Sequence, residues 1–341
     1  MKAAILEKIN SPLIVRDVSC TPLKIGQVKV KIIISGLCGA QLQEISGMKG
    51  NEKFLPHLMG HEGCGIVEEI GEGVTHVKIG DKVVMHWRVG KGIESPFPQY
   101  ILDGKIISSG KVTTLSEYSI VSENRLTVVP QDTDERLCAL LGCCLTTALG
   151  TINNEIDLKF GESIMIVGCG GLGLNLIQGS KMASAYPIIG VDNNNEKKNM
   201  VLDLGANNFI NISNIQNELK EKIDVIIDTT GNPDAISATL PFLSDKGRYV
   251  LVGQPKPGES INIPNANFLF GGNGKIIKAT QGGKTSPNED IMRYVKLYKA
   301  GLLDIDSLIT HEFFLDNIND AIDILRNGNA GRIMIRMKSY E

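Results

Sequence analysis

The sequence predicts an α/β protein that combines a β-rich part with a doubly wound parallel sheet, and three observations support this fold class. Residues 1–145 consist of short apolar stretches separated by Gly, Pro and Asn, which is typical of antiparallel strands. From about residue 160, apolar stretches alternate with helical patterns, which indicates βαβ units and a parallel sheet. A cluster of glycines joins the first of these strands to the first helix.

The elements follow one another in an order that defines the expected domains. The β-rich part contains strands such as 28–34 and 82–85. The later elements are expected at strand 163–167, helix 172–183, strand 187–191, helix 196–204, strand 225–228, helix 234–242 and strand 248–252, followed by helices 289–299 and 317–326 and strand 331–336. Because chain termini often lie close together, we expect one domain at 1–146, a second at 147–284, and a return of 285–341 to the first.

The composition is that of an ordinary globular protein. The 341 residues are 42% hydrophobic and 21% charged, with a net charge of −3 and a pI of about 6.0. This balance argues against broad binding of nucleic acid or of a membrane surface, which needs a basic face. We see no signal-peptide pattern, and the apolar stretch 137–150 is too short to span a bilayer, so a cytoplasmic location is expected.

Seven cysteines are scattered along the chain: Cys20, Cys38, Cys64, Cys138, Cys143, Cys144 and Cys169. Their odd number and wide spacing argue against a disulfide framework. In a reducing compartment we expect them to be small buried residues or metal ligands.

The glycine cluster fits the dinucleotide-binding pattern G-x-G-x-x-G, with its glycines at Gly168, Gly170 and Gly173. The first glycine permits a tight turn, the second lets the backbone approach a pyrophosphate, and the third lets helix and strand pack closely. Gly171 and Leu172 open the helix, whose N-terminal N–H groups favour phosphate. The alternative is a glycine turn in an α/β protein that binds no dinucleotide.

Asp192 ends the second strand of this part, nineteen residues after Gly173. A carboxylate there accepts hydrogen bonds from the ribose hydroxyls of NAD and repels the extra phosphate of NADP. Lys197 and Lys198 lie nearby, and we include Lys197 among the cofactor-binding candidates. NAD is therefore favoured over NADP.

Cys38, His61 and Cys143 form a candidate metal site. One imidazole and two thiolates suit Zn²⁺ and leave a fourth position for water or substrate. The three residues are far apart in the sequence, so their spacing alone does not identify them as ligands. Taken singly, a cysteine is more often an inert buried thiol than a metal ligand, and a single histidine is more often structural.

The stretch 60–83, GHEGCGIVEEIGEGVTHVKIGDKV, resembles the zinc signature of the medium-chain alcohol dehydrogenases, G-H-E-x-x-G-x(5)-G-x-x-V followed by G-D-x-V. The matching residues are Gly60, His61, Glu62, Gly65, Gly71, Val74, Gly80 and Asp81. The contexts Cys38-Gly39 and Gly142-Cys143 also match, as does the glycine fingerprint. The resemblance extends over essentially the whole chain.

The resemblance implies a GroES-like catalytic domain built from both chain ends, with a Rossmann domain inserted between them. It implies a catalytic zinc on Cys38, His61 and Cys143, with Glu62 beside it as a residue that can coordinate zinc transiently. It implies nicotinamide contacts around Thr147, at 252–254 and at 279–281, which include Val252, Gly253 and Ala279. It also suggests that Arg332 reaches the pyrophosphate, and that the edge at 266–278 pairs with a second copy in a homodimer or homotetramer.

Four departures from the family pattern qualify this interpretation. Ala40 replaces the Ser or Thr that accepts the alcohol proton, and Gln43 replaces the His that ends the relay to solvent. Gln41 replaces the Asp that orients the zinc-bound His, so it supplies no negative charge. The segment 88–112, where a structural-zinc lobe would fall, contains no cysteine, so we expect one zinc only. The proton is then expected to leave through water and Glu62, through another residue such as His86 or His57, or through a group on the substrate.

Trp87 and Arg88 are the candidate substrate-binding residues. Trp87 occupies a position that lines the substrate pocket in the resembling family, although a core or rim role fits it equally. Arg88 is suited to an anionic group such as phosphate, although surface arginines are common. The segment around them is similar to dehydrogenases of bacterial surface-sugar gene clusters. We therefore expect a polyol, sugar or amino-alcohol derivative, including phosphorylated forms, before a simple alcohol.

Together these features predict an NAD-dependent zinc alcohol dehydrogenase that transfers a hydride between NAD(H) and an alcohol or carbonyl substrate. One alternative is a zinc-free enoyl or quinone reductase on the same fold, against which the Cys/His/Cys set argues. Another is a non-catalytic nucleotide-binding homologue, an interpretation that the missing relay residues keep open.

Overall fold

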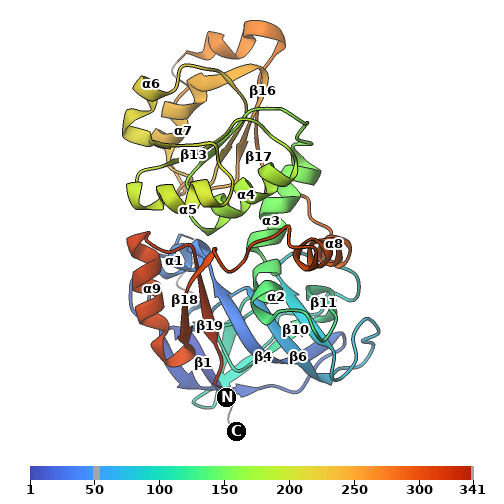
Figure 1. Cartoon of the computed structure of the whole chain (residues 1–341). Coiled ribbons are helices and arrows are strands. Elements are labelled where there is room, and N and C mark those ends of the chain that lie inside the picture. Colours follow the sequence, from blue (N-terminus) through green and yellow to red (C-terminus); the bar gives the residue numbers. More distant parts are fainter. Residues whose placement is uncertain (49–53, 264, 339–341) are drawn as a thin grey trace. The chain divides into compact units, whose positions relative to one another are not determined.

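The computed structural model describes residues 1–48, 54–263 and 265–338, without the side chains of 271–273. It divides into two compact units (Figure 1). The first unit contains Met1–Thr146, Ser286–Gly301 and Ile309–Glu341, and the second contains Thr147–Thr285 and Leu302–Leu308. The segment 302–308 therefore clusters with the second unit, whereas the sequence analysis assigned all of 285–341 to the first.

The described residues of the first unit form two sheets, and four α-helices lie within them. The larger sheet has the order β11-β7-β6-β4-β19-β18, with β10 also paired to β4. Its strands are β4 (Gln27–Leu37), β6 (Glu62–Ile70), β7 (Lys82–His86), β10 (Tyr118–Ser122), β11 (Leu126–Val128), β18 (Ile309–Phe314) and β19 (Arg332–Arg336). The C-terminal strand β19 pairs antiparallel with β4, with Ile333 opposite Leu37, so the end of the chain lies beside the strand that leads to Cys38.

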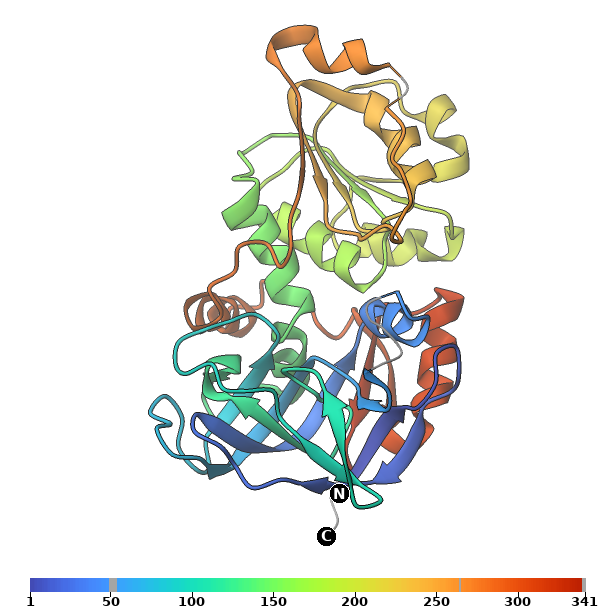
Figure 2. The same cartoon turned by 180° about the vertical axis from the view of Figure 1, so that it is seen from behind.

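The second sheet of this unit has the order β2-β1-β5-β9-β8-β3. Its strands are β1 (Lys2–Leu6), β2 (Ile14–Asp17), β3 (Ser19–Cys20), β5 (His57–Leu58), β8 (Tyr100–Leu102) and β9 (Lys105–Ser109). The helices of the unit are α1 (Gly39–Ile45), α2 (Glu135–Leu141), α8 (Pro287–Lys299) and α9 (Ile318–Asn327). Figure 2 shows the same strands from behind, where the hairpin of β8 and β9 and strand β10 lie in front.

The second unit is a parallel sheet with the order β14-β13-β12-β15-β16-β17, which is the doubly wound order 3-2-1-4-5-6. Its strands are β12 (Ile164–Val167), β13 (Ile188–Asp192), β14 (Asn208–Asn211), β15 (Ile223–Asp228), β16 (Leu243–Leu251) and β17 (Ile276–Ala279). Its helices are α4 (Gly171–Met182), α5 (Lys198–Asp203), α6 (Ile215–Glu218) and α7 (Pro233–Thr239). Helix α3 (Cys144–Gly150) begins in the first unit and ends in the second.

Strand β12 shows why helices cover both faces of this sheet. Successive side chains of a strand point to opposite faces. Ile164 and Ile166 pack in one apolar cluster with residues of α4 and α5. Met165 and Val167 pack in another cluster with residues of α6 and α7. A strand that is buried on both sides has a continuous apolar sequence, and this run of apolar residues is what predicted the strand.

The predicted fold class is confirmed, but the strand pattern identified neither edge strand of the parallel sheet, and only the family resemblance placed a sheet edge at 266–278. The two edge strands are β14 and β17. An edge strand is half exposed, so β14 carries two asparagines and Ile276 and Ile277 of β17 are exposed. Neither strand has the apolar run by which the central strands were recognised.

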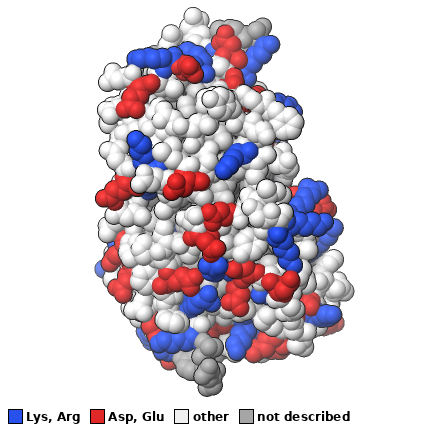
Figure 3. Space-filling model, viewed as in Figure 1, with Lys and Arg blue, Asp and Glu red and all other residues white. Residues whose placement is uncertain are grey.

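The surface carries both signs of charge, and Figure 3 shows basic and acidic side chains interspersed on the visible face. Among the described residues, no single helix is long and apolar enough to cross a membrane. Helix α2 and the segment Cys144–Glu155 pass that test only as a pair, by length and composition, with a bend of 58° between them.

Candidate metal centre and dinucleotide site

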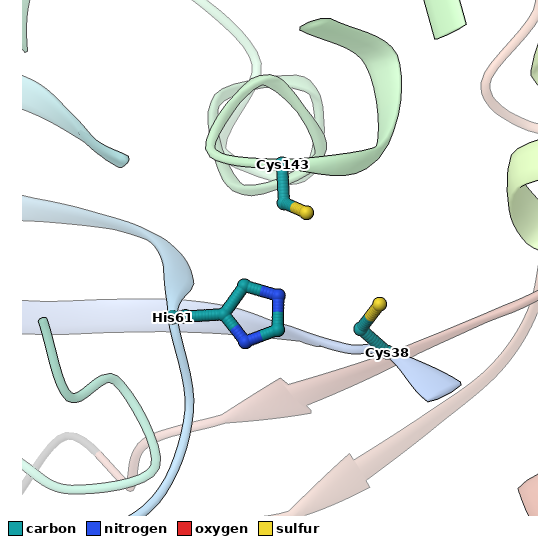
Figure 4. A group of neighbouring side chains, drawn as sticks. All are labelled: Cys38, His61 and Cys143. Carbon is teal, nitrogen blue, oxygen red and sulfur yellow. The ribbon is translucent and has the colours of Figure 1, made fainter. Parts of the chain in front are cut away.

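The structure brings Cys38, His61 and Cys143 together within the first unit. Cys38 lies where β4 ends and α1 begins, His61 directly precedes β6, and Cys143 follows α2. Figure 4 shows the three side chains directed toward one another from these separate segments. Their ligand atoms all lie within 4.8 Å of one another.

This donor set fits a zinc ion. Zinc binds thiolate sulfur at about 2.3 Å and imidazole nitrogen at about 2.0 Å, so small shifts of the side chains suffice for convergence. Within the described part of the chain, no other group of three His, Cys, Asp or Glu side chains converges in this way. The hydrogen bond from the Cys143 thiol, together with the nearby His61, lowers the pKa of Cys38 well below its usual value. This lowering of the pKa favours the thiolate form of Cys38, which is the form in which cysteine binds a metal.

Glu62, next to His61 in the sequence, is buried at the start of β6. Its Oε1 forms an ion pair with Arg332, and its Oε2 accepts a hydrogen bond from the backbone N–H of Cys144 at 3.1 Å. Burial raises the pKa of the Glu62 carboxyl, and the positive charge of Arg332 opposes that rise. Glu62 is therefore held beside the cluster as a buried, charge-paired carboxylate.

Arg332 lies on β19 rather than in a loop, and its side chain is 4% exposed. Arg332 is therefore a buried residue of the sheet and not a solvated surface arginine. Its contact with the pyrophosphate stays a prediction, because the partner that the structure provides within this unit is Glu62.

Two glycines make room for this buried pair, and the sequence analysis assigned neither a role in it. A Cβ on Gly36 would lie 2.7 Å from Oε1 of Glu62, and one on Gly142 would lie 2.8 Å from its Cβ. Any side chain at these positions would collide with Glu62. The signal was present, since both glycines lie within two residues of a proposed ligand.

Gln41, the replacement for the family's Asp, is fully buried on α1. Its Oε1 accepts a hydrogen bond from the N–H of Cys38 at 2.9 Å, and its Nε2 lies 2.7 Å from Nδ1 of His61. The amide thus keeps the position of an orienting group without its charge. Ala40 and Gln43 lie on the same helix and carry no hydroxyl or imidazole, so the family's proton relay is absent there.

His86 does not fit the relay role considered for it. It is 1% exposed, its Nδ1 donates to the carbonyl oxygen of Arg88 at 2.7 Å, and its Nε2 accepts from Oγ1 of Thr127 at 3.0 Å. Burial lowers the pKa of His86 to about 4. Both ring nitrogens are occupied and the ring is neutral, so His86 is a structural residue.

Trp87 and Arg88 follow β7 directly and are partly exposed. The Arg88 guanidinium carbon lies 5.6 Å from the centre of the Trp87 ring, within the range of a cation–π contact. The buried Arg125 donates a hydrogen bond to the Trp87 carbonyl and forms an ion pair with Glu94. This pair anchors the loop that carries both candidate substrate residues, and the sequence analysis did not single it out.

The glycine fingerprint adopts the geometry that its pattern predicts. Gly168 follows β12 with a φ of +89°, where a side chain would be strained. A Cβ on Gly173 would overlap the carbonyl of Gly168, so the third glycine permits the close contact of helix and turn. A Cβ on Gly170 would meet nothing within 4 Å, which leaves open space in front of the N-terminus of α4, where Gly171 and Leu172 lie.

Asp192 ends β13 beside this turn. Its Oδ2 accepts a hydrogen bond from the N–H of Cys169 at 2.7 Å, and its Oδ1 accepts from the N–H of Asn194 at 2.9 Å. Lys197 forms an ion pair with Oδ2 at 3.3 Å. The carboxylate is thereby held at the carboxyl end of the sheet, where ligands of doubly wound folds bind.

The cofactor candidates Val252, Gly253 and Ala279 lie at the same end of this sheet. Val252 and Gly253 follow β16, and their N–H groups donate to the carbonyl of Asp228 at 2.8 and 3.0 Å. Ala279 ends β17. Thr147, on α3, accepts a hydrogen bond at its carbonyl from Thr151. The buried Asp228, whose role was not predicted from the sequence, ends β15 and accepts hydrogen bonds from the N–H groups of Thr230 and Gly231.

Comparisons with known proteins agree with this geometry. The model of the alcohol dehydrogenase GroES-like domain matches residues 24–131, and that of the zinc-binding dehydrogenases matches 171–298. Alcohol dehydrogenase 6 of Peromyscus maniculatus is 30% identical over 367 residues, which cover 98% of this chain and 97% of the relative. S-(hydroxymethyl)glutathione dehydrogenase of Paracoccus denitrificans is 29% identical and covers 98% and 99%.

A comparison with solved structures shows that the fold is shared. The crystal structure of benzyl alcohol dehydrogenase from Acinetobacter calcoaceticus superimposes with a TM-score of 0.88 at 24% identity, over 99% of both chains. Both domain models, the whole-length relatives and the Cys38, His61 and Cys143 cluster thus lead to one assignment. The chain belongs to the zinc-type medium-chain alcohol dehydrogenases and is an oxidoreductase of that family.

Proposed function

We propose that this oxidoreductase transfers a hydride between NAD(H) and an alcohol or carbonyl substrate, with Cys38, His61 and Cys143 as the ligands of one catalytic zinc. The observation that carries the proposal is the convergence of two sulfurs and one imidazole nitrogen within 4.8 Å. A zinc ion bound there supplies Lewis-acid chemistry, which favours the alkoxide of an alcohol and polarises a carbonyl. Glu62, held by Arg332, adds a fixed negative charge beside the ligands.

The use of NAD is supported by the second unit. The open space at Gly170 accommodates a pyrophosphate against the backbone, and the N-terminus of α4 favours its negative charge. Asp192 accepts from ribose hydroxyls and disfavours the additional phosphate of NADP. Lys197 reduces this repulsion through its ion pair with Asp192, so the preference for NAD over NADP is not absolute. The ratio of the affinities for NAD and NADP measures it.

The proton route is proposed to differ from that of the family. Ala40 and Gln43 offer no relay, and both nitrogens of His86 are engaged. Nδ1 of His57 is buried and makes no hydrogen bond to the described residues, and burial lowers the pKa of that ring. His57 and Glu62 are therefore the protein groups that we propose for proton transfer, together with water.

The substrate is proposed to be a polyol, sugar or amino-alcohol derivative, with phosphorylated forms included in the class. Arg88 beside Trp87 pairs a cation with a flat apolar surface, a combination suited to such a molecule. A panel of diols, sugar alcohols, their phosphates and S-(hydroxymethyl)glutathione tests the class by NAD⁺ reduction. Faster turnover of phosphorylated substrates that is lost in Arg88→Ala supports the anionic anchor, and equal rates without the phosphate exclude it.

Self-association is proposed through the edge strand β17. Ile276 is 51% exposed and Ile277 is 37% exposed on this edge, and Phe270 just before it is 82% exposed. Exposed apolar residues on the open edge of a sheet are typical of a surface that meets another chain. Sedimentation of the wild type and of Ile276→Lys distinguishes a homo-oligomer from a monomer.

The central experiment measures zinc and turnover together. One zinc per chain, with activity lost in Cys38→Ala and after chelation, supports the proposal. Full turnover without zinc favours a zinc-free reductase. NADH binding without turnover on any alcohol or carbonyl favours a non-catalytic homologue.

A further inference from the structure

Gln41 has one carbonyl oxygen and two partners that compete for it. Its Oε1 accepts from the N–H of Cys38 at 2.9 Å, which caps the first turn of α1. Its Nε2 lies 2.7 Å from Nδ1 of His61. The Gln41 side chain is 0% exposed, so bulk water does not reach it as a substitute partner.

The conflict concerns which nitrogen of His61 carries the hydrogen. Because Nδ1 is turned to Gln41, the other nitrogen, Nε2, faces the two sulfurs (Figure 4). A neutral imidazole that binds a metal through Nε2 carries its hydrogen on Nδ1. In the arrangement observed, the Gln41 amide group donates to Nδ1, and this leaves the hydrogen of a neutral ring on Nε2, where the metal must bind.

Zinc binding therefore requires the Gln41 amide to present its oxygen to Nδ1. Its NH₂ group then faces the N–H of Cys38, so that two donors oppose each other and the cap of α1 is lost. A carboxylate at this position has two acceptor oxygens and satisfies both donors at once. A buried donor without an acceptor is unfavourable in free energy, and this penalty makes the free energy of metal binding less favourable.

We propose that Gln41 is a positioning residue that couples zinc binding to the cap of α1 and weakens that binding relative to a carboxylate. The inference rests on the proposed function, because it takes Cys38, His61 and Cys143 as the ligands. Its consequence is a catalytic zinc that exchanges more readily than it would beside a carboxylate. Groups that orient a metal ligand typically change metal affinity by about 10- to 100-fold.

Gln41→Glu tests the proposal, because it replaces the amide by a carboxylate of the same size. Gln43→Glu is the matched control, since it adds the same charge on the same helix, at a partly exposed position. Zinc affinity is measured by competition with a chromogenic chelator. We expect zinc binding about 10- to 100-fold tighter in Gln41→Glu and little changed in Gln43→Glu. An equal gain in both variants, or none in Gln41→Glu, overturns the inference.

A second measurement uses the wild type and does not depend on the folding of a variant. If zinc removes the acceptor of the Cys38 N–H, hydrogen exchange at that amide becomes faster after zinc is added to chelator-treated protein. Unchanged or slower exchange contradicts the proposal. A wild type that binds no zinc overturns the proposed function as well, whereas zinc binding with an unresponsive Gln41→Glu overturns this inference alone.

Discussion

Two glycines of the fingerprint, Gly170 and Gly173, differ in what a methyl group would meet, and this predicts opposite outcomes for two alanine substitutions. Gly170 has backbone angles of −78° and −170°, which alanine adopts without strain, and a Cβ there meets nothing within 4 Å. A Cβ on Gly173 overlaps the carbonyl of Gly168 and lies 3.0 Å from its carbonyl carbon. The first methyl group affects only a ligand, and the second affects the fold.

We expect Gly170→Ala to leave the melting temperature unchanged or to raise it slightly, since the loss of a glycine stabilises by about 0.4–1 kcal/mol where its conformation is allowed. The methyl group then occupies the space through which a pyrophosphate approaches the N-terminus of α4. Displacement of one hydrogen bond to a charged group costs about 1.5–3 kcal/mol. NADH affinity should therefore fall by roughly 10- to 100-fold.

Gly173→Ala should instead destabilise the protein by about 1–3 kcal/mol, because the turn at Gly168 must move away from α4. For a unit of this size that corresponds to a fall in melting temperature of about 2–4 °C per kcal/mol. Differential scanning fluorimetry and titration of NADH fluorescence measure the two effects separately. NADH binding by Gly170→Ala at wild-type affinity would refute this reasoning, as would an equal loss of stability in both variants.

Further predictions concern the first unit. Burial lowers the pKa of His86 to about 4, whereas an unfolded histidine has a pKa near 6.5, so the free energy of unfolding should fall as the pH drops from about 6.5 toward 4. Between pH 7 and pH 5 the loss amounts to about 2 kcal/mol. Urea unfolding followed by the fluorescence of the neighbouring Trp87 should detect this loss, and His86→Gln should abolish it. Gly142→Ala should lower the free energy of unfolding by about 1–3 kcal/mol and reduce the zinc content, because the added Cβ would lie 2.8 Å from the Cβ of Glu62. A variant with normal metal content and a normal melting temperature would contradict this packing argument. Glu62→Gln should lower the free energy of unfolding by about 3–5 kcal/mol, because it leaves the buried Arg332 unpaired. The double variant Glu62→Gln/Arg332→Met should recover part of that stability in thermal unfolding, and no recovery would show that the two residues are not coupled.

Much of the fold follows from local patterns. The alternation of apolar strands and helices, together with the glycines at 168, 170 and 173, predicted the parallel sheet, because each such feature is set by residues close in sequence. Local patterns did not identify β14 or β17, because an edge strand is half exposed and lacks a continuous apolar run, and the sheet edge at 266–278 was expected only from the family resemblance. The segment 302–308 clusters with the second unit for a reason of packing, since Leu308 is buried in the cluster beneath α4.

The sequence by itself determined the kind of chemistry. It contains the residues of the zinc signature and the dinucleotide turn, and it shows that the relay residues are missing at Ala40 and Gln43. Tertiary structure decided which groups meet. Glu62 and Arg332 are 270 residues apart and pair only because β19 returns to β4, and the two groups that hydrogen-bond to Gln41 come from different segments. The physical reason is that local propensity sets turns and strands, whereas ion pairs and shared hydrogen bonds depend on the order and register in which those strands assemble.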